Sequence, residues 1–269
     1  MPYDNRKGAL RRDRALGRRC LSRTLPLARS IHNRFDMAPT FPRVKVCCIG
    51  SEEEAALAVR MGASAVGLVS RMPSGPGPIP DARIRDIART VPPGVATFLL
   101  TCETSAEPII AQQRYCGVNT LQLVDEVEPG VHDALRGALP GVRIVQVIHV
   151  RGEGALIEAQ RVAPRVDAIL LDSGNPSLAT KELGGTGRSH DWALSRKIRD
   201  AVRVPVYLAG GLNPQNVAQA MAQVQPFAVD VCSGLRIGGR LDSTRLEQFM
   251  RAVQEAASAN PLAGEKRRA

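Results

Sequence analysis

The sequence has few aromatic residues and no long apolar run. Phe, Trp and Tyr together make up 3% of its 269 residues, which argues against a surface that stacks the bases of single-stranded nucleic acid. No stretch of about 18 consecutive apolar residues occurs, so we expect no membrane-spanning helix. No apolar segment follows the first basic residues, so we expect no secretory signal peptide. With 44% hydrophobic residues, the chain can still bury a sizeable core.

The sequence also lacks a paired cysteine motif, because no two of its cysteines are separated by two residues. The cysteines are Cys20, Cys47, Cys48, Cys102, Cys116 and Cys232. Zinc binding and thioredoxin-like redox chemistry are therefore not indicated, and no metal site is expected. We expect free thiols, mostly buried, as in a cytoplasmic protein. A disulfide between the neighbours Cys47 and Cys48 would be strained and is not expected.

Positive charge is concentrated at the N-terminus. The chain has a formal net charge of +10, and residues 1–36 contain ten Lys and Arg against three Asp. We expect residues 1–40 to be an Arg-rich arm. It is either disordered or reflects a start assigned too early, with Met37 as the true start. The alternatives are a transit peptide and a polyanion-binding arm, so any nucleic-acid binding would be confined to this segment. A body over 41–257 and a solvated tail over 258–269 complete the expected organisation.

From residue 43 onward, short apolar segments alternate with segments of helical periodicity. The predicted strands are 44–48, 64–69, 95–101, 119–124, 143–149, 167–172, 204–209 and 226–231. The predicted helices lie near 51–61, 81–90, 105–116, 130–138, 153–163, 191–202, 214–223 and 242–256. Apolar strands that alternate with helices indicate a parallel sheet covered on both faces. Eight such units predict an α/β fold, a single (β/α)8 TIM barrel; a doubly wound open sheet is the alternative.

Three glycine clusters follow the last three predicted strands, and the loops after the seventh and eighth strands are the usual phosphate site of such barrels. They lie at 184–187, 210–211 and 233–234. Glycine lets backbone N–H groups approach an anion closely. We therefore expect a phosphate-bearing ligand, and we assign its binding to Gly185, Thr186, Gly187, Gly210, Gly211, Ser233 and Gly234.

Two ionisable residues end predicted strands and are candidates for proton transfer. A thiolate at Cys47 could remove a proton, and a protonated carboxyl at Asp172 could donate one, since enclosure raises the pKa of a carboxyl. The residues alone leave structural alternatives open, a small buried hydrophobe for Cys47 and a helix cap or loop-ordering acid for Asp172. His149 is a further candidate, although a lone histidine is more often structural. If Cys47 faces the barrel lumen, Cys48 should face the helices.

Together these motifs resemble the phosphoribosylanthranilate isomerase family. The similarity extends over residues 43–254, and Gln122 also fits it. The matching segments are Val44–Cys47, Leu170–Asp172, Gly184–Gly187 with Asp191 and Trp192, Leu208–Val217, and Ala228–Val231 with Ser233 and Gly234.

The resemblance implies an Amadori rearrangement of tryptophan biosynthesis, in which an aminoaldose phosphate becomes an aminoketose phosphate. Asp172 would protonate the ring oxygen and Cys47 would remove the C2′ proton, with the glycine clusters holding the phosphate. It implies a small-molecule phosphosugar substrate, no metal and no redox cofactor. A monomer or a homodimer in the cytoplasm is expected, without a membrane partner. Substrate-positioning roles are assigned to Arg71, Gln122, His149 and Asp230.

The sequence departs from the family pattern on the side expected to bind the anthranilate. The Cys-Gly-Ile-Thr of the family is Cys47–Gly50 here, and the family arginine after the second strand has no counterpart in Met72–Pro78. Arg71 lies upstream and could replace it. Val124-Asp125 occupies the place of a His-Gly in the family, and residues 188–190 occupy the place of a Lys-Thr-Phe. The alternatives are a divergent barrel isomerase or epimerase acting on another phosphosugar, and a non-catalytic phosphosugar-binding protein.

Overall fold

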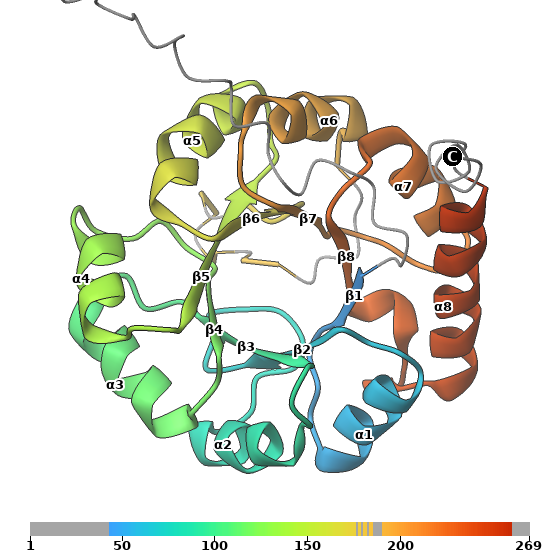
Figure 1. The fold of residues 1–269 in the computed structure, drawn as a ribbon, viewed down its shortest axis with the longest axis horizontal. Helices are drawn as coiled ribbons and strands as arrows, with labels where there is room; N and C mark the ends of the chain where they lie inside the picture. The colour runs from blue at the N-terminus through green and yellow to red at the C-terminus, as the bar shows by residue number, and fades with distance from the viewer. Residues whose placement is uncertain (1–42, 176, 179, 182, 185–189, 260–269) are drawn as a thin grey trace, which may run out of the picture. The chain divides into compact units, whose positions relative to one another are not determined.

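Eight parallel strands close into a barrel and eight helices surround it (Figure 1). The computed structural model describes residues 43–259 except 176, 179, 182 and 185–189, so most of the predicted arm and tail lie outside the described residues. The strands are β1 (Arg43–Val46), β2 (Ala65–Val69), β3 (Ala96–Thr101), β4 (Thr120–Leu123), β5 (Arg143–His149), β6 (Ala168–Asp172), β7 (Val206–Leu208) and β8 (Ala228–Val231). The predicted TIM barrel is confirmed, and the open doubly wound sheet is wrong.

The barrel closes where the first and last strands pair. Arg43 lies opposite Ala228 and Val46 opposite Val231, in parallel register. This pairing places residues about 185 positions apart in the sequence on neighbouring strands. Every strand therefore has two neighbours, and all of their C-terminal ends meet at one mouth of the barrel.

A helix follows each strand, as predicted, with small shifts at the ends. The helices are α1 (Glu52–Arg60), α2 (Asp81–Thr90), α3 (Ala106–Cys116), α4 (Val131–Ala138), α5 (Gly154–Val162), α6 (Trp192–Ala201), α7 (Val217–Val224) and α8 (Ser243–Ser258). Side chains cap several N-termini: Ser51 accepts from the Glu54 N–H at 3.2 Å, and Asp191 accepts from the Ala193 N–H at 2.8 Å. None of the helices described is long and apolar enough to cross a bilayer.

Short irregular elements connect the last strand to the last helix. A 3-10 turn, η2 (Ser233–Leu235), directly follows β8, and a small antiparallel hairpin pairs β9 (Arg236–Ile237) with β10 (Arg240–Leu241). Another 3-10 turn, η1 (Ala163–Arg165), extends α5. Residues of η2 and of the preceding loop therefore sit at the mouth of the barrel.

Side chains alternate between two cores along each strand. Val44 and Val46 of β1 belong to the outer core, between the barrel and the helices. Lys45 points into the lumen, where it lies over the Phe98 ring at 5.2 Å from the ring centroid, and Cys47 belongs to the same inner cluster. This period-two alternation places polar groups of β1 inside the barrel.

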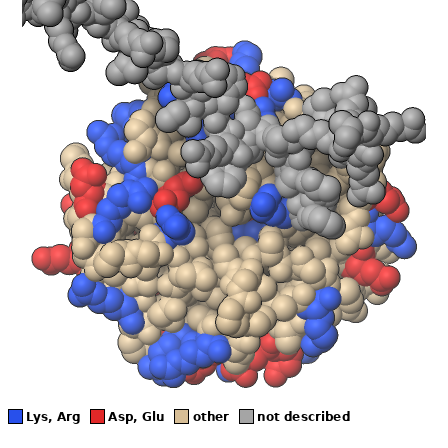
Figure 2. Space-filling view, in the orientation of Figure 1, with Lys and Arg blue, Asp and Glu red and all other residues tan. Residues whose placement is uncertain are grey.

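On the face shown in Figure 2, Lys and Arg side chains are interspersed with Asp and Glu around the rim. The middle of this face is formed mostly by other residues. The described part of this surface thus carries charges of both signs and not a single basic field.

Candidate active site

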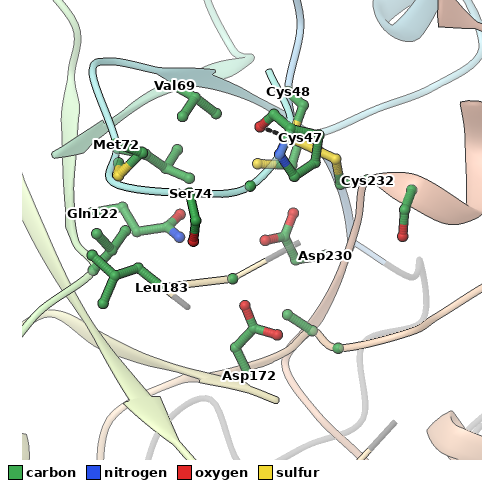
Figure 3. Close-up of a pocket in the computed structure, with 18 of the residues that line it drawn as sticks. Cys47, Cys48, Val69, Met72, Ser74, Gln122, Asp172, Leu183, Asp230 and Cys232 are labelled. Carbon is green, nitrogen blue, oxygen red and sulfur yellow. Dashed lines mark hydrogen bonds between the residues drawn. A yellow bond between two sulfur atoms is a disulfide. The ribbon is translucent and has the colours of Figure 1, made fainter. Parts of the chain in front are cut away.

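A pocket opens at the C-terminal ends of the strands, as the barrel fold predicts. Several predicted residues line it together (Figure 3). They are Cys47, Gln122, Asp172, Gly210, Gly211, Asp230 and Ser233.

Cys47 is a free thiol at the floor of this pocket and is 6% exposed. Gly67 of β2 makes room for it, because a Cβ there would lie 2.7 Å from the Cys47 Sγ and 2.9 Å from the Lys45 Nζ. Burial raises the pKa of Cys47 to about 11, although the neighbouring Lys45 ammonium pulls that pKa down. The thiol is thus held against a cation in a place that water hardly reaches.

The ammonium beside Cys47 is itself paired with a carboxylate. Lys45 Nζ lies 2.9 Å from Asp230 Oδ2, and Lys45 is fully buried. Burial works to lower the pKa of Lys45, but Asp230 and then Cys47 outweigh it and the pKa is raised. Burial raises the pKa of Asp230. Its second oxygen, Oδ1, has no hydrogen-bond partner among the described atoms and lies in the wall of the pocket.

Asp172 stands across the pocket from Cys47, at the end of β6 (Figure 3). Its Oδ1 accepts a hydrogen bond from the Ser173 N–H at 2.7 Å. Gly184 packs against Oδ2, because a Cβ at Gly184 would lie 2.7 Å from that oxygen. Burial raises the pKa of Asp172, which favours the protonated carboxyl that a general acid needs.

The loops after β7 and β8 pack backbone against backbone. Gly210 and Gly211 adopt left-handed conformations with φ of 82° and 63°. A Cβ at Gly234 would lie 2.1 Å from the Leu212 carbonyl oxygen, so only glycine fits there. Two of the three predicted glycine clusters therefore meet at the pocket. Gly185, Thr186 and Gly187 of the third lie outside the described residues.

Gln122 of β4 lines the pocket, near Leu183 (Figure 3). It is 3% exposed, and its Oε1 has no partner in the described part of the chain. A buried amide without a partner is costly, so a ligand is the natural partner for it. The wall around Gln122 is apolar and consists of Val69, Met72, Leu100, Val124 and Leu183. The described lining residues include no Lys or Arg.

Two predicted positioning residues lie away from this pocket. The Arg71 side chain is 89% exposed and its guanidinium is 3.8 Å from the Glu103 carboxylate. His149 lines a separate, polar cavity with Asp125 and Lys181, and its Nε2 lies 3.0 Å from the Val124 carbonyl oxygen. Burial lowers the pKa of His149. The structure therefore does not bring either side chain to the Cys47 pocket.

Cys48 corrects two expectations. The strand ends at Val46, earlier than predicted, and Cys48 has φ of 62°. Alternation across a strand no longer applies there, so Cys48 lines the pocket and does not face the helices. It also forms a disulfide with Cys232, with a Cα–Cα distance of 5.9 Å. The expectation of free thiols at these two positions is wrong, because closure of the barrel brings them together.

The loops after β2 and β6 meet above the pocket. Ser74 Oγ donates a hydrogen bond to the Lys181 carbonyl oxygen at 2.6 Å. A Cβ at Gly75 would lie 3.3 Å from the Gly184 carbonyl oxygen. Ser74, Gly75 and Gly184 all line the pocket, so these loops cover its outer side.

Sequence reasoning missed two polar residues at this site. Lys45 had a detectable signal, since it is a charged residue inside an apolar strand and two positions before Cys47, hence on the same face. His190 had none. Burial lowers its pKa to about 4, and its two ring nitrogens have no partner among the atoms described. Its Nδ1 would lie 2.9 Å from a Cβ at Gly210. In the described residues, no three His, Cys, Asp or Glu side chains gather as metal ligands.

Comparisons with known proteins agree on one family. A sequence model described as N-(5′-phosphoribosyl)anthranilate isomerase matches residues 44–252. Isomerases of that name from Methanocella arvoryzae and Haloferax volcanii are 37% and 38% identical, over 79% and 81% of this chain and 98% and 95% of their own. A crystal structure of phosphoribosylanthranilate isomerase from Thermotoga maritima superposes with a TM-score of 0.68 at 31% identity, covering 80% of this chain and all of that one.

Proposed function

The chain belongs to the N-(5′-phosphoribosyl)anthranilate isomerase family, and we propose that Cys47 and Asp172 are the two groups that transfer protons in its reaction. The protein is an isomerase of tryptophan biosynthesis. It converts N-(5′-phosphoribosyl)anthranilate, an aminoaldose phosphate, into the carboxyphenylamino-deoxyribulose phosphate, an aminoketose phosphate. The family model matches 44–252, which includes the described part of the pocket.

The proposed sequence of proton transfers follows from the two protonation states. Neutral Asp172 donates its proton to the ring oxygen, the C1′–O bond breaks, and the ring opens to an iminium. The thiolate of Cys47 then takes the C2′ proton, which the iminium makes acidic. Protonation of C1′ and loss of the enol proton give the ketone. The substrate supplies its own electron sink, so these steps balance with no net gain or loss of protons.

One observation carries this assignment: Cys47, directly after β1, and Asp172, at the end of β6, line the same pocket although β1 and β6 are not neighbours in the barrel. A sugar bound between them would present one face to each residue. Burial raises the pKa of Asp172, which suits a general acid. Burial also raises the pKa of Cys47, and the Lys45 ammonium acts against this by stabilising a thiolate.

We assign the phosphate of the substrate to the loops after β7 and β8. The close backbone packing of Gly234 against Leu212 and the left-handed conformations of Gly210 and Gly211 support a backbone anion site. The unpartnered oxygens of Gln122 and Asp230 would then accept hydrogen bonds from substrate hydroxyl or amino groups between phosphate and aglycone. The positioning roles predicted for His149 and Arg71 are not part of this proposal, since neither side chain lines the pocket.

We propose that the protein is a monomer or a homodimer in the cytoplasm, where an enzyme of amino-acid biosynthesis would act. The relative from Thermotoga maritima is described as dimeric and has been obtained as monomers, so both states are compatible with this barrel.

The decisive experiment compares steady-state turnover of Cys47→Ser and Asp172→Asn with the parent protein. Each change should lower kcat by about 10²- to 10⁴-fold, the usual contribution of general acid–base catalysis. Cys102→Ser is the matched control, since Cys102 is a free thiol that does not line the pocket, and it should keep full activity. Undiminished turnover in a folded Cys47→Ser or Asp172→Asn protein would overturn that residue's role.

A further inference from the structure

We propose that Lys45 is a positioning residue of this reaction. Its ammonium lies beneath the pocket, stabilises the thiolate form of Cys47, and is paired with the Asp230 carboxylate. This inference deepens the proposed function and rests on Cys47 being the base. Lys45 is not among the residues that line the pocket. Its ammonium therefore acts on the substrate only through its two neighbours.

The geometry of β1 and β2 brings the ammonium to the thiol. Lys45 and Cys47 lie two positions apart and both point into the lumen, as the inner cluster and the Phe98 contact show. The absent side chain of Gly67 leaves the space that they share, since a Cβ there would be under 3 Å from both Sγ and Nζ. Any larger residue at position 67 would push the two groups apart.

The pair is also expensive for the fold, which argues that it has a function. Lys45 and Asp230 are 0% and 7% exposed, and two charges removed from water lose more hydration than a simple ion pair commonly recovers. Apolar side chains of similar volume would fill the lumen at least as stably. A structural role alone therefore does not account for an ammonium in this position.

The groups that face Cys47 come from several strands. Lys45 precedes it on β1, Asp230 faces it from β8, and Asp172 lies across the pocket on β6. On β2 the facing residue is Gly67, which carries no charge, and Tyr207 of β7 lies in the same lumen. Lys45 is the cation of this set, and it lowers the pKa of Cys47, whereas burial and Asp230 raise that pKa.

This balance decides how much active enzyme exists. The reaction needs Cys47 ionised while Asp172 is still protonated, and the pKa of Cys47, about 11, makes that combination a minor fraction at neutral pH. Each unit by which the pKa of Cys47 rises would reduce this fraction about tenfold. Loss of the Lys45 charge should therefore reduce turnover through the thiolate population, without removing any contact to the substrate.

The experiment measures alkylation of Cys47 by iodoacetamide as a function of pH, in unreduced protein, with the labelled peptide quantified by mass spectrometry. Lys45→Met should slow alkylation at a fixed pH below the thiol pKa by at least about tenfold, one pKa unit. Asp230→Asn should change it in the opposite direction, because a carboxylate that raises the thiol pKa is gone. The kcat/KM of Lys45→Met should fall by a similar factor to its alkylation rate.

A double variant, Lys45→Met with Asp230→Asn, covers the case in which Lys45→Met leaves an unpaired buried carboxylate and does not fold. The double variant should alkylate more slowly than Asp230→Asn alone. An unchanged pH profile in folded Lys45→Met, or equal profiles of the double variant and Asp230→Asn, would overturn the proposal. Because alkylation does not depend on turnover, this outcome is distinct from failure of the base assignment, which Cys47→Ser tests.

Discussion

Cys48 and Cys232 are joined by a disulfide across the seam of the barrel, where β1 pairs with β8, although 184 positions separate them in the sequence. The bond ties the loop that follows β1 to the loop that follows β8 (Figure 3). A cross-link that closes so long a loop should stabilise the fold by roughly 2–4 kcal/mol. We expect reduction by dithiothreitol to lower the free energy of unfolding by that amount, measured by urea denaturation.

The control for this prediction is the variant with Cys48→Ser and Cys232→Ser. It should unfold at the same lower urea concentration whether or not the reductant is present. If the reductant leaves the unfolding of the parent protein unchanged while thiol titration shows two new free thiols, the cross-link contributes nothing to stability.

Gly234 offers a second prediction, because its backbone touches the Leu212 carbonyl. A methyl group at Gly234 would lie 2.1 Å from that oxygen, so Gly234→Ala must push apart the loops after β7 and β8, to which we assign the phosphate. We expect ribose 5-phosphate to bind at least about tenfold more weakly, which corresponds to about one charge-assisted hydrogen bond. Isothermal titration measures this directly. Gly152→Ala is the control, since nothing lies within 4 Å of a Cβ at Gly152; equal weakening in both variants would remove the loops from the explanation.

The barrel itself could be predicted from the sequence, because it follows from local patterns. Alternating apolar segments and helical periods are properties of consecutive residues, and so are caps such as Ser51 before Glu54. The glycines and the Cys47–Asp172 pair could be placed at the mouth because all strands of a parallel barrel end there.

What the sequence could not predict depends on distant residues meeting at the seam. The Cys48–Cys232 bond and the Lys45–Asp230 pair both link β1 with β8, and no local pattern specifies their distances. The early end of β1 was also hidden, since Cys47 and Cys48 continue an apolar run while the backbone turns left-handed at Cys48. Loop conformation decides the position of Arg71, which a count of residues cannot supply.

Glu54 predicts a pH dependence of stability. Burial would raise its pKa, but hydrogen bonds from Arg236 and from the Leu241 and Gly50 N–H groups outweigh burial and lower it. A lowered pKa means that Glu54 stabilises the fold above its unfolded-state pKa and loses this contribution as pH falls through the folded pKa. Glu54→Gln should cost roughly 1–3 kcal/mol at pH 7 and less at pH 3, measured by denaturant unfolding.

Glu52→Gln serves as the control on the same helix, because the Glu52 side chain is 41% exposed and its carboxylate lies 3.3 Å from the exposed Arg83 guanidinium. Such a pair contributes about 0–1 kcal/mol. A Glu54→Gln loss that is the same at both pH values would mean that packing, and not the charge, is responsible.

Arg71 gives a prediction of no effect. Its side chain is 89% exposed and 3.8 Å from Glu103, and it does not line the pocket. Arg71→Ala should therefore change KM and kcat by less than about twofold, within the effect expected for an exposed ion pair. A tenfold rise in KM would instead show that the loop after β2 carries Arg71 to the substrate on binding.

The pH profile of kcat/KM joins the two proposed proton-transfer groups in one measurement. The productive form has Asp172 protonated and Cys47 ionised. The pKa of Cys47 is about 11, and burial raises that of Asp172. Between the two pKa values the productive fraction is constant, so we expect a plateau of kcat/KM there.

Below the pKa of Asp172 the rate should fall with decreasing pH. There the thiolate fraction of Cys47 keeps falling, while Asp172 is already protonated and no longer compensates. Above about pH 11 it should fall again, because Asp172 is then ionised while the thiolate population no longer rises. Stopped-flow measurement of substrate fluorescence, in jumps from a neutral stock, limits damage at extreme pH. An alkaline fall that lies well below pH 11 would assign the base to a group other than Cys47, and His149, whose pKa is lowered by burial, would be tested next as His149→Gln.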